Sequence, residues 1–233
     1  MKNIGIILAG GSGHRMRHPL PKQFMTFCGK TVLEHTLHAF QLHPDIDEIF
    51  VVTHTDYRVK TEKILQKGLF PKVTQILNGG AERYHSTLSA LRACPPMECN
   101  LFIHDAVRPL VSQEIISNCV QALEQHMACT TAIPSTDTIL FSDSTHDYIQ
   151  EIPDRKFLFN VQTPQAFKKS ILEQAYQSAL TDPDFHPTDD CGVIQKYLPE
   201  IKIKIVAGNP ANLKITYPED LGIAEKLLSQ RHP

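Results

Sequence analysis

The first strand-like segment of the chain and the loop that follows it restrict the fold more than any other feature. Residues 4–9 form a continuous apolar run, which is typical of a parallel strand covered by helices on both faces. The run leads into a loop containing Gly10, Gly11 and Gly13, where a backbone without Cβ atoms can approach a ligand closely. Successive N–H groups in such a turn form a concavity that binds anions. The segment therefore predicts an anion site at the end of a parallel strand.

The charges and the spacing of this loop indicate which anion it binds. Arg15 and Lys22 place positive charge beside the glycines, which favours the triphosphate of a nucleotide. The loop is not a Walker A sequence, because no Gly-Lys-Ser/Thr ends it. Its glycines also lack the G-x-G-x-x-G spacing of a dinucleotide site, which disfavours an enzyme that transfers hydride.

Strand-like and helix-like segments alternate along most of the chain. This order predicts an α/β fold of Rossmann-like type, with one open, mostly parallel sheet and helices on both faces, in a single domain over residues 1–233. Ligands of such sheets bind at the carboxyl ends of the strands, where the glycine loop, Gly80 and Asp105 all fall. We expect strands at 4–9, 48–53, 73–77, 101–104, 128–133 and 201–207, and helices at 32–42, 60–68, 83–93, 113–125, 168–180 and 218–229.

The alternation stops at residues 134–158. This stretch is polar and is flanked by apolar residues at 139–141 and 148–149, which predicts two short strands joined by a polar turn. The simplest interpretation is a surface hairpin.

Composition excludes several classes of protein. The 233 residues carry a formal net charge of −2, so we expect no nucleic-acid or membrane partner. The six cysteines contain no C-x-x-C pair and are expected to be reduced thiols. No signal-peptide pattern and no apolar run of about 20 residues is present, which predicts a cytoplasmic protein.

The motifs taken together resemble a known family. The chain is similar to the 2-C-methyl-D-erythritol 4-phosphate cytidylyltransferases and the related ribitol-5-phosphate cytidylyltransferases over nearly its whole length. The opening pattern L-A-G-G-S-G-H-R-M, followed by Pro21-Lys22-Gln23, carries most of the resemblance. Further matching segments are Gly79–Arg83, His104–Pro109, Asp137-Thr138, Arg155, Gln162–Gln165, Thr188–Asp190 and Asn212–Thr216.

The resemblance implies an enzyme that transfers CMP from CTP to a polyol phosphate and releases pyrophosphate, with Mg²⁺ as cofactor. Asp105 would hold the Mg²⁺, because this ion prefers oxygen ligands and is often bound by one or two carboxylates plus substrate phosphates. The implied catalytic cations are Arg15, Lys22 and Lys214. The implied CTP-binding residues are Ala9, Gly10, Gly11, Gly13, Gly80, Arg83, Ser86 and Asp105.

The resemblance also implies that residues 134–158 form a protruding β-arm. It implies a homodimer in which this arm is exchanged and reaches the partner's site. Thr138 and Arg155 would bind the acceptor phosphate from the neighbouring subunit, and the segment 162–165 would form a structural turn near the site. The implied polyol-phosphate residues are Arg108, Asp137, Thr138, Arg155, Thr163, Thr188 and Asp189.

Several alternatives remain open from the residues alone. Asp105 could cap a helix, and Lys214 could lie on an edge strand. A binding or regulatory module without turnover is the alternative of another class. Methylerythritol phosphate is the first acceptor by frequency in the family. Val107 stands where the family usually has a second alanine, and the pattern Ile152-Pro153-x-Arg155 resembles the ribitol phosphate branch.

Overall fold

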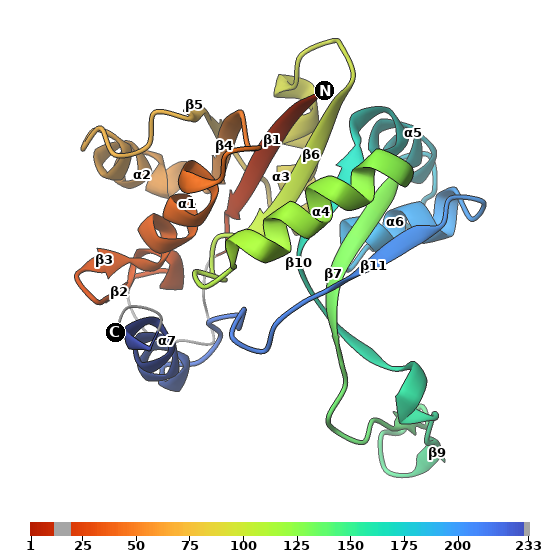
Figure 1. The fold of residues 1–233 in the computed structure, drawn as a ribbon. Helices are drawn as coiled ribbons and strands as arrows, with labels where there is room; N and C mark the ends of the chain where they lie inside the picture. Colours follow the sequence, from red (N-terminus) through yellow and green to blue (C-terminus); the bar gives the residue numbers. More distant parts are fainter. Residues whose placement is uncertain (12–19, 231–233) are drawn as a thin grey trace.

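A seven-stranded sheet forms the centre of the protein (Figure 1). The structure is a computed structural model that describes residues 1–11 and 20–230. The strand order is β11-β7-β10-β6-β1-β4-β5. The bounds of these strands are β1 Lys2–Ala9, β4 Glu48–Thr53, β5 Val73–Asn78, β6 Cys99–Asp105, β7 Ala128–Pro134, β10 Phe159–Lys168 and β11 Ile203–Ala207.

The sheet is mostly parallel, as the alternating sequence pattern predicts. β1 pairs in parallel with β4 and β6, and β10 is antiparallel to both of its neighbours. The register places Leu8 opposite Asp105 and Ala9 opposite Thr53, and Thr53 in turn opposite Asn78. The carboxyl ends of β1, β4, β5 and β6 therefore meet along one edge, where ligands of such sheets bind.

Helices cover both faces of the sheet, each over its own apolar core. The helices α1 (Val32–Leu42), α2 (Arg58–Leu65) and α4 (Gln113–Gln125) pack over one face. The helices α3 (Arg83–Ala93), α5 (Lys169–Ala179) and α6 (Asp190–Tyr197) pack over the other. Strands buried on both faces explain the continuous apolar run of β1.

Short elements and caps complete the body. Helix α7 (Glu219–Ser229) packs beside the small ribbon of β2 (Thr26–Phe27) and β3 (Lys30–Thr31). Two 3₁₀ turns follow the ends of strands, η2 at Lys22–Phe24 and η3 at Thr55–Tyr57. Helix α1 begins with a reciprocal capping box, in which Thr31 accepts from the Glu34 N–H and the Glu34 carboxylate accepts from the Thr31 N–H. No helix in the described residues has the length and apolar character needed to cross a membrane.

Besides the short ribbon and the 3₁₀ turns, two longer elements were not expected from the sequence. Residues 162–165 do not form a turn, because they lie inside the ten-residue strand β10, where the register shifts between Val161 and Gln165. Proline has no N–H to donate to a neighbouring strand, so within a sheet it is found at irregularities such as this shift. For the same reason, a proline in the sequence argues against a strand. Helix α6 was missed because it has only eight residues, although Asp189 caps its N-terminus by accepting from the Gly192 N–H.

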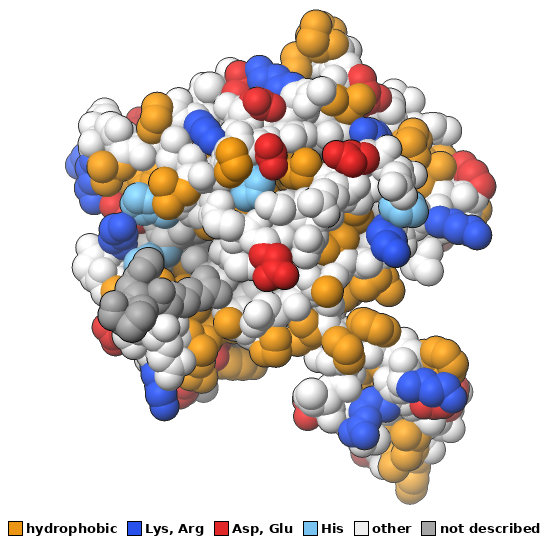
Figure 2. All heavy atoms as spheres, viewed as in Figure 1, with side chains coloured by type: hydrophobic (Ala, Val, Ile, Leu, Met, Phe, Trp, Pro, Cys, Tyr) orange, Lys and Arg blue, Asp and Glu red, His pale blue; other side chains and the backbone are white. Residues whose placement is uncertain are grey.

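The expected excursion forms an arm that stands away from the body (Figure 1). It carries β8 (Phe141–Ser142) and β9 (Ile149–Glu151), which pair in antiparallel fashion, and the 3₁₀ turn η4 (Arg155–Phe157). Its surface shows hydrophobic side chains beside charged ones (Figure 2), and large hydrophobic side chains are exposed at Ile139, Leu140, Phe141, Tyr148, Ile149, Ile152 and Phe157.

Candidate active site

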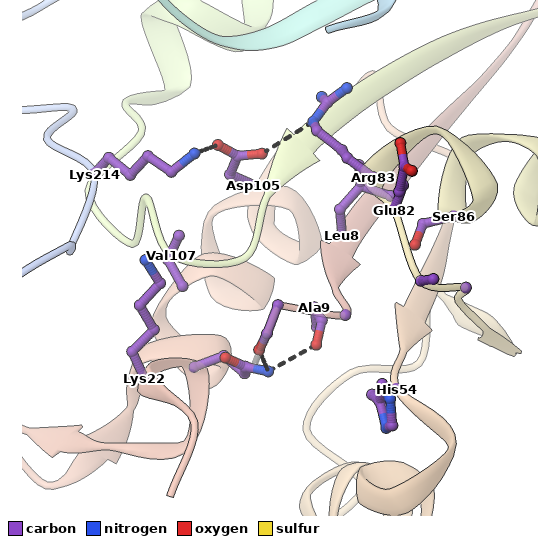
Figure 3. A pocket seen from close by; sticks show the side chains of 15 residues that line it. Leu8, Ala9, Lys22, His54, Glu82, Arg83, Ser86, Asp105, Val107 and Lys214 are labelled. Atoms are coloured by element: carbon purple, nitrogen blue, oxygen red, sulfur yellow. Dashed lines mark hydrogen bonds and ion pairs between the residues drawn. The ribbon is translucent and has the colours of Figure 1, made fainter. Parts of the chain in front are cut away.

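A cavity of about 540 Å³ opens at the shared carboxyl edge of the strands (Figure 3). The end of β1 and the turn η2 form one wall, the start of α3 forms another, and Asp105 with Lys214 lies across from them. The lining residues are Leu8, Ala9, Gly10, Gly11, Lys22, Gln23, His54, Gly80, Ala81, Glu82, Arg83, Ser86, Asp105, Val107 and Lys214.

Asp105 is the acidic centre of the cavity and is surrounded by cations. Its carboxylate lies 2.8 Å from Lys214 Nζ, 3.7 Å from Arg83 Nε and 3.8 Å from Arg108 Nε. Burial alone would raise the pKa of Asp105, but the three cations outweigh burial and hold that pKa well below its usual range. Asp105 is therefore a permanent carboxylate, and its contacts with cations take the place of the helix cap considered above.

The backbone places Lys214 at the cavity. The Ile215 N–H donates to the Val107 carbonyl over 2.8 Å, and the Arg108 guanidinium donates to the Asn212 carbonyl over 2.8 Å. These bonds attach the segment around Lys214 to the turn that follows Asp105. The segment belongs to no strand among the described residues, so the edge-strand alternative for Lys214 is wrong.

Arg83 connects two carboxylates from distant parts of the chain. Its guanidinium forms an ion pair with the fully buried Asp190, and its Nε approaches Asp105. The Tyr176 hydroxyl donates to the other Asp190 oxygen over 2.7 Å. Burial acts to lower the pKa of Arg83, but Asp190 and Asp105 outweigh it and raise that pKa. Arg83 is therefore a fixed cation whose position depends on α6 and α5.

Gly79 and Gly80, just before α3, pack closely against the first residues of that helix. A Cβ at Gly79 would lie 2.6 Å from Ser86 Oγ, and a Cβ at Gly80 would lie 2.5 Å from His85 Cβ. Ser86 is itself buried and faces the cavity. Neither glycine position has room for a larger residue, and Gly80 and the Ser86 side chain both line the cavity.

His104 and Thr163 support Asp105 from behind. His104 is fully buried, with Nε2 3.1 Å from the Arg108 carbonyl and Nδ1 2.9 Å from Thr163 Oγ1. The Thr163 hydroxyl also accepts from the Asp105 N–H over 3.1 Å. Burial lowers the pKa of His104 to about 4, so the ring is neutral near pH 7. Neutral His104 donates from Nε2 and accepts at Nδ1, which fits both partners.

The donor set suits a hard cation that also binds phosphate. The described residues contain no group of three or more His, Cys, Asp or Glu side chains arranged to hold a metal ion. Mg²⁺ needs no such group, because one or two carboxylates and the oxygens of bound phosphates are sufficient. Asp105 at the cavity provides the carboxylate.

Most residues expected to bind CTP or to act in catalysis line this cavity. They are Ala9, Gly10, Gly11, Lys22, Gly80, Arg83, Ser86, Asp105 and Lys214. Arg15 and Gly13, two further expected residues, lie outside the described residues.

The residues expected to bind the acceptor are dispersed. Arg108 and Thr163 are buried behind Asp105, and Asp137, Thr138 and Arg155 are exposed on the arm. Thr188 lines a separate hollow of about 170 Å³ beside Phe185 and Tyr197. Asp189 caps α6 and accepts from Gln165 Nε2 over 2.6 Å.

Sequence reasoning missed three lining residues that have polar side chains. Gln23 stands next to Lys22 in the Pro-Lys-Gln motif, and this neighbourhood was the available signal. His54 follows β4 directly, so its place at a strand end could have indicated it. Glu82 precedes α3 and lies inside the matching segment Gly79–Arg83, which was the available signal.

The fold and the cavity define a class of protein. An open α/β sheet carries at its carboxyl edge a glycine turn, several cations and a buried carboxylate, which is the arrangement of a nucleotide-binding enzyme that handles phosphates. A family model described as IspD, 2-C-methyl-D-erythritol 4-phosphate cytidylyltransferase, matches residues 4–230. The chain belongs to this family of cytidylyltransferases and is therefore a nucleotidyltransferase.

Individual relatives agree with this assignment. A 2-C-methyl-D-erythritol 4-phosphate cytidylyltransferase from Thermobifida fusca is 42% identical over 227 residues, covering 95% of this chain and 91% of that protein. A bifunctional ribulose 5-phosphate reductase/CDP-ribitol pyrophosphorylase from Haemophilus influenzae is 48% identical over 99% of this chain, which spans 49% of that longer protein. The solved 4-diphosphocytidyl-2C-methyl-D-erythritol synthase from Anaerococcus prevotii superposes with a TM-score of 0.86 at 32% identity, covering 98% of both chains.

Proposed function

We propose that this protein transfers CMP from CTP to a polyol phosphate and releases pyrophosphate. The observation that carries the proposal is Asp105 at a cavity formed by the end of β1, with Lys214 and Arg83 against its carboxylate. A reaction between two anions needs this kind of site, because charge repulsion between the reactants is the main obstacle.

The nucleotide would lie in the cavity at the carboxyl end of β1. Backbone groups of Ala9, Gly10 and Gly11 would bind the phosphates, and the side of the cavity lined by Gly80 and Ser86 would hold the cytosine. A pyrimidine has a carbonyl and an exocyclic amine, which backbone groups and one hydroxyl can bind. Arg83, fixed by Asp190, supports this wall.

Catalysis would depend on positioning and electrostatics rather than on a covalent intermediate. An oxygen of the acceptor phosphate attacks the α-phosphorus of CTP, and the bond to pyrophosphate breaks. Lys22 and Lys214, with Arg15, would stabilise the charge on the α-phosphate and on the leaving pyrophosphate. Asp105 would hold a Mg²⁺ ion, which neutralises phosphate charge when it is bound.

The acceptor side is proposed to involve a second copy of the chain. The arm carries Asp137, Thr138 and Arg155, and Arg155 donates to the Thr136 carbonyl over 3.1 Å. Exposed apolar side chains surround these residues, and a patch of this kind is typical of a protein interface (Figure 2). We propose a homodimer in which each arm brings Thr138 and Arg155 to the acceptor phosphate in the partner's site.

Two acceptors are candidates. 2-C-Methyl-D-erythritol 4-phosphate is the first, supported by the family model and by the Thermobifida fusca relative, and would give the isoprenoid precursor CDP-methylerythritol. D-Ribitol 5-phosphate is the second and would give CDP-ribitol. It is supported by the 48% identity to the Haemophilus influenzae protein. Val107, which stands where the family usually has alanine, lines the cavity.

A pyrophosphate-release assay with CTP, Mg²⁺ and each polyol phosphate in turn tests the proposal. We expect release that depends on CTP and on one of the two acceptors, and far less with UTP, ATP or GTP. Binding of CTP without turnover on any acceptor would support a regulatory module and contradict the proposal. The ratio of kcat/KM for the two acceptors decides between them.

A further inference from the structure

Gln23 belongs to the Pro-Lys-Gln motif, but the roles proposed above leave it without a function. Its side chain lines the cavity and is 1% exposed. Its amide nitrogen Nε2 lies 2.8 Å from the Ala9 carbonyl oxygen and 3.0 Å from the Gly11 carbonyl oxygen. Both partners are acceptors, so Gln23 donates both of its amide hydrogens to the exit of β1.

The position of Gln23 in the chain makes these bonds a clamp. Gln23 lies in the turn η2 between Lys22, another lining residue, and Phe24. Phe24 is buried in the core beneath α1 and packs against the ring of Tyr57, with centroids 5.5 Å apart. The turn is therefore anchored to the core, and Gln23 attaches the end of β1 to that anchor.

The clamp controls which backbone groups face the phosphates. A carbonyl oxygen that pointed at an anion would repel it, whereas an N–H group attracts it. A trans peptide holds its C=O and N–H on opposite sides. Fixing the Ala9 carbonyl on Gln23 therefore also fixes the direction of the Gly10 N–H, at a position where glycine would otherwise allow many conformations.

We propose that Gln23 is a positioning residue for the nucleotide. Its amide holds the carbonyls of Ala9 and Gly11 away from the triphosphate. Because Gln23 is the neighbour of Lys22, the same bonds fix the position of Gly10 and Gly11 relative to Lys22. The inference rests on the proposed function, because it takes CTP as the ligand of this cavity. It assigns no contact with substrate to Gln23 itself.

Gln23→Met and Gln23→Glu test whether the amide N–H groups of Gln23, rather than the size and shape of its side chain, are needed. Methionine keeps the length and removes both donors. Glutamate keeps the shape but places negative charge against two carbonyl oxygens beside an anion site. Gln113→Met is the matched control, because the exposed Gln113 also donates its amide to a main-chain carbonyl, that of Ala39, outside the cavity.

The readouts are KM for CTP, KM for the acceptor, thermal stability and amide hydrogen exchange. We expect Gln23→Met to raise KM for CTP about tenfold, as loss of two hydrogen bonds allows, with the KM for the acceptor within about twofold of wild type. Gln23→Glu should raise the KM for CTP further. Peptides covering residues 8–11 should exchange faster in both variants, and Gln113→Met should match wild type in all of these measurements.

An unchanged KM for CTP in Gln23→Met, or equal rises in both KM values, would overturn the inference while leaving the proposed function intact. Unchanged exchange at residues 8–11 would overturn it as well. A wild-type protein that releases no pyrophosphate would instead refute the proposed function. If Gln23→Met does not fold, Gln23→Asn takes its place, because asparagine keeps the amide but is too short to reach both carbonyls.

Discussion

Protonation of His104 should destabilise the protein between pH 6.5 and 4. The ring is fully buried against the Phe40 ring, and its Nδ1 accepts from the Thr163 hydroxyl, a bond that a protonated ring cannot accept. Burial lowers the pKa of His104 from 6.5 to about 4 in the folded state. The unfolded chain takes up a proton first as the pH falls, so acid favours the unfolded state.

The size of the effect follows from the two pKa values. The stability that His104 contributes is fully present above pH 6.5 and is lost as the pH falls towards 4. The difference between these values corresponds to about 3 kcal/mol, since each pH unit of difference is worth about 1.4 kcal/mol. Typical domains are stable by about 5–15 kcal/mol, so the loss would be a large fraction of the total.

Urea unfolding at several pH values from 7.5 to 4.5 measures this effect, with His104→Gln as the test variant. Burial also lowers the pKa values of His35, His38 and His43, so only the difference between variant and wild type isolates His104. We expect His104→Gln to be less stable at pH 7.5 but to lose less stability on acidification.

The exposed His186 provides the control for this measurement. His186→Gln should follow the wild-type pH dependence. If His104→Gln also lost the same free energy of unfolding as wild type between pH 6.5 and 4.5, the reasoning about its burial would be refuted.

The remaining predictions concern the proposed chemistry. Lys22→Ala should lower kcat at least about a hundredfold with an unchanged melting temperature, and an unchanged kcat would remove Lys22 from the mechanism. Arg155→Ala should raise KM for the acceptor roughly tenfold and leave the affinity for CTP nearly unchanged, as measured by calorimetry; the reverse pattern would contradict its assignment. Asp105→Asn should abolish the dependence of pyrophosphate release on Mg²⁺ along with most of the activity. A variant that kept the wild-type Mg²⁺ titration would show that Asp105 does not hold the ion.

Much of the fold could be predicted because strands buried on both faces leave a clear pattern in the sequence. The helix at 83–93 and the strand at 48–53 have the predicted bounds. Strand β10 was missed because its central Gln-Thr-Pro-Gln sequence has the composition of a turn. The strand tolerates Pro164 because the register shifts there, and that shift depends on neighbours far away in the sequence.

The site was partly predictable for a related reason. Asp105 and the glycine turn follow strands, and parallel strands bring their carboxyl ends together, so their meeting could be expected. The clamp by Gln23 and the support by His104 could not, because both depend on side chains meeting backbone groups of other elements. Thr188 follows no strand directly, and it lies at a separate hollow.

A crystal structure of the protein with CTP and Mg²⁺ would show whether the cavity at the carboxyl end of β1 is the nucleotide site. We predict cytosine beside Gly80 and Ser86, the triphosphate along Gly10 and Lys22, and a metal ion on Asp105. A nucleotide bound at another place, or a triphosphate that contacts neither the end of β1 nor Lys22, would contradict it.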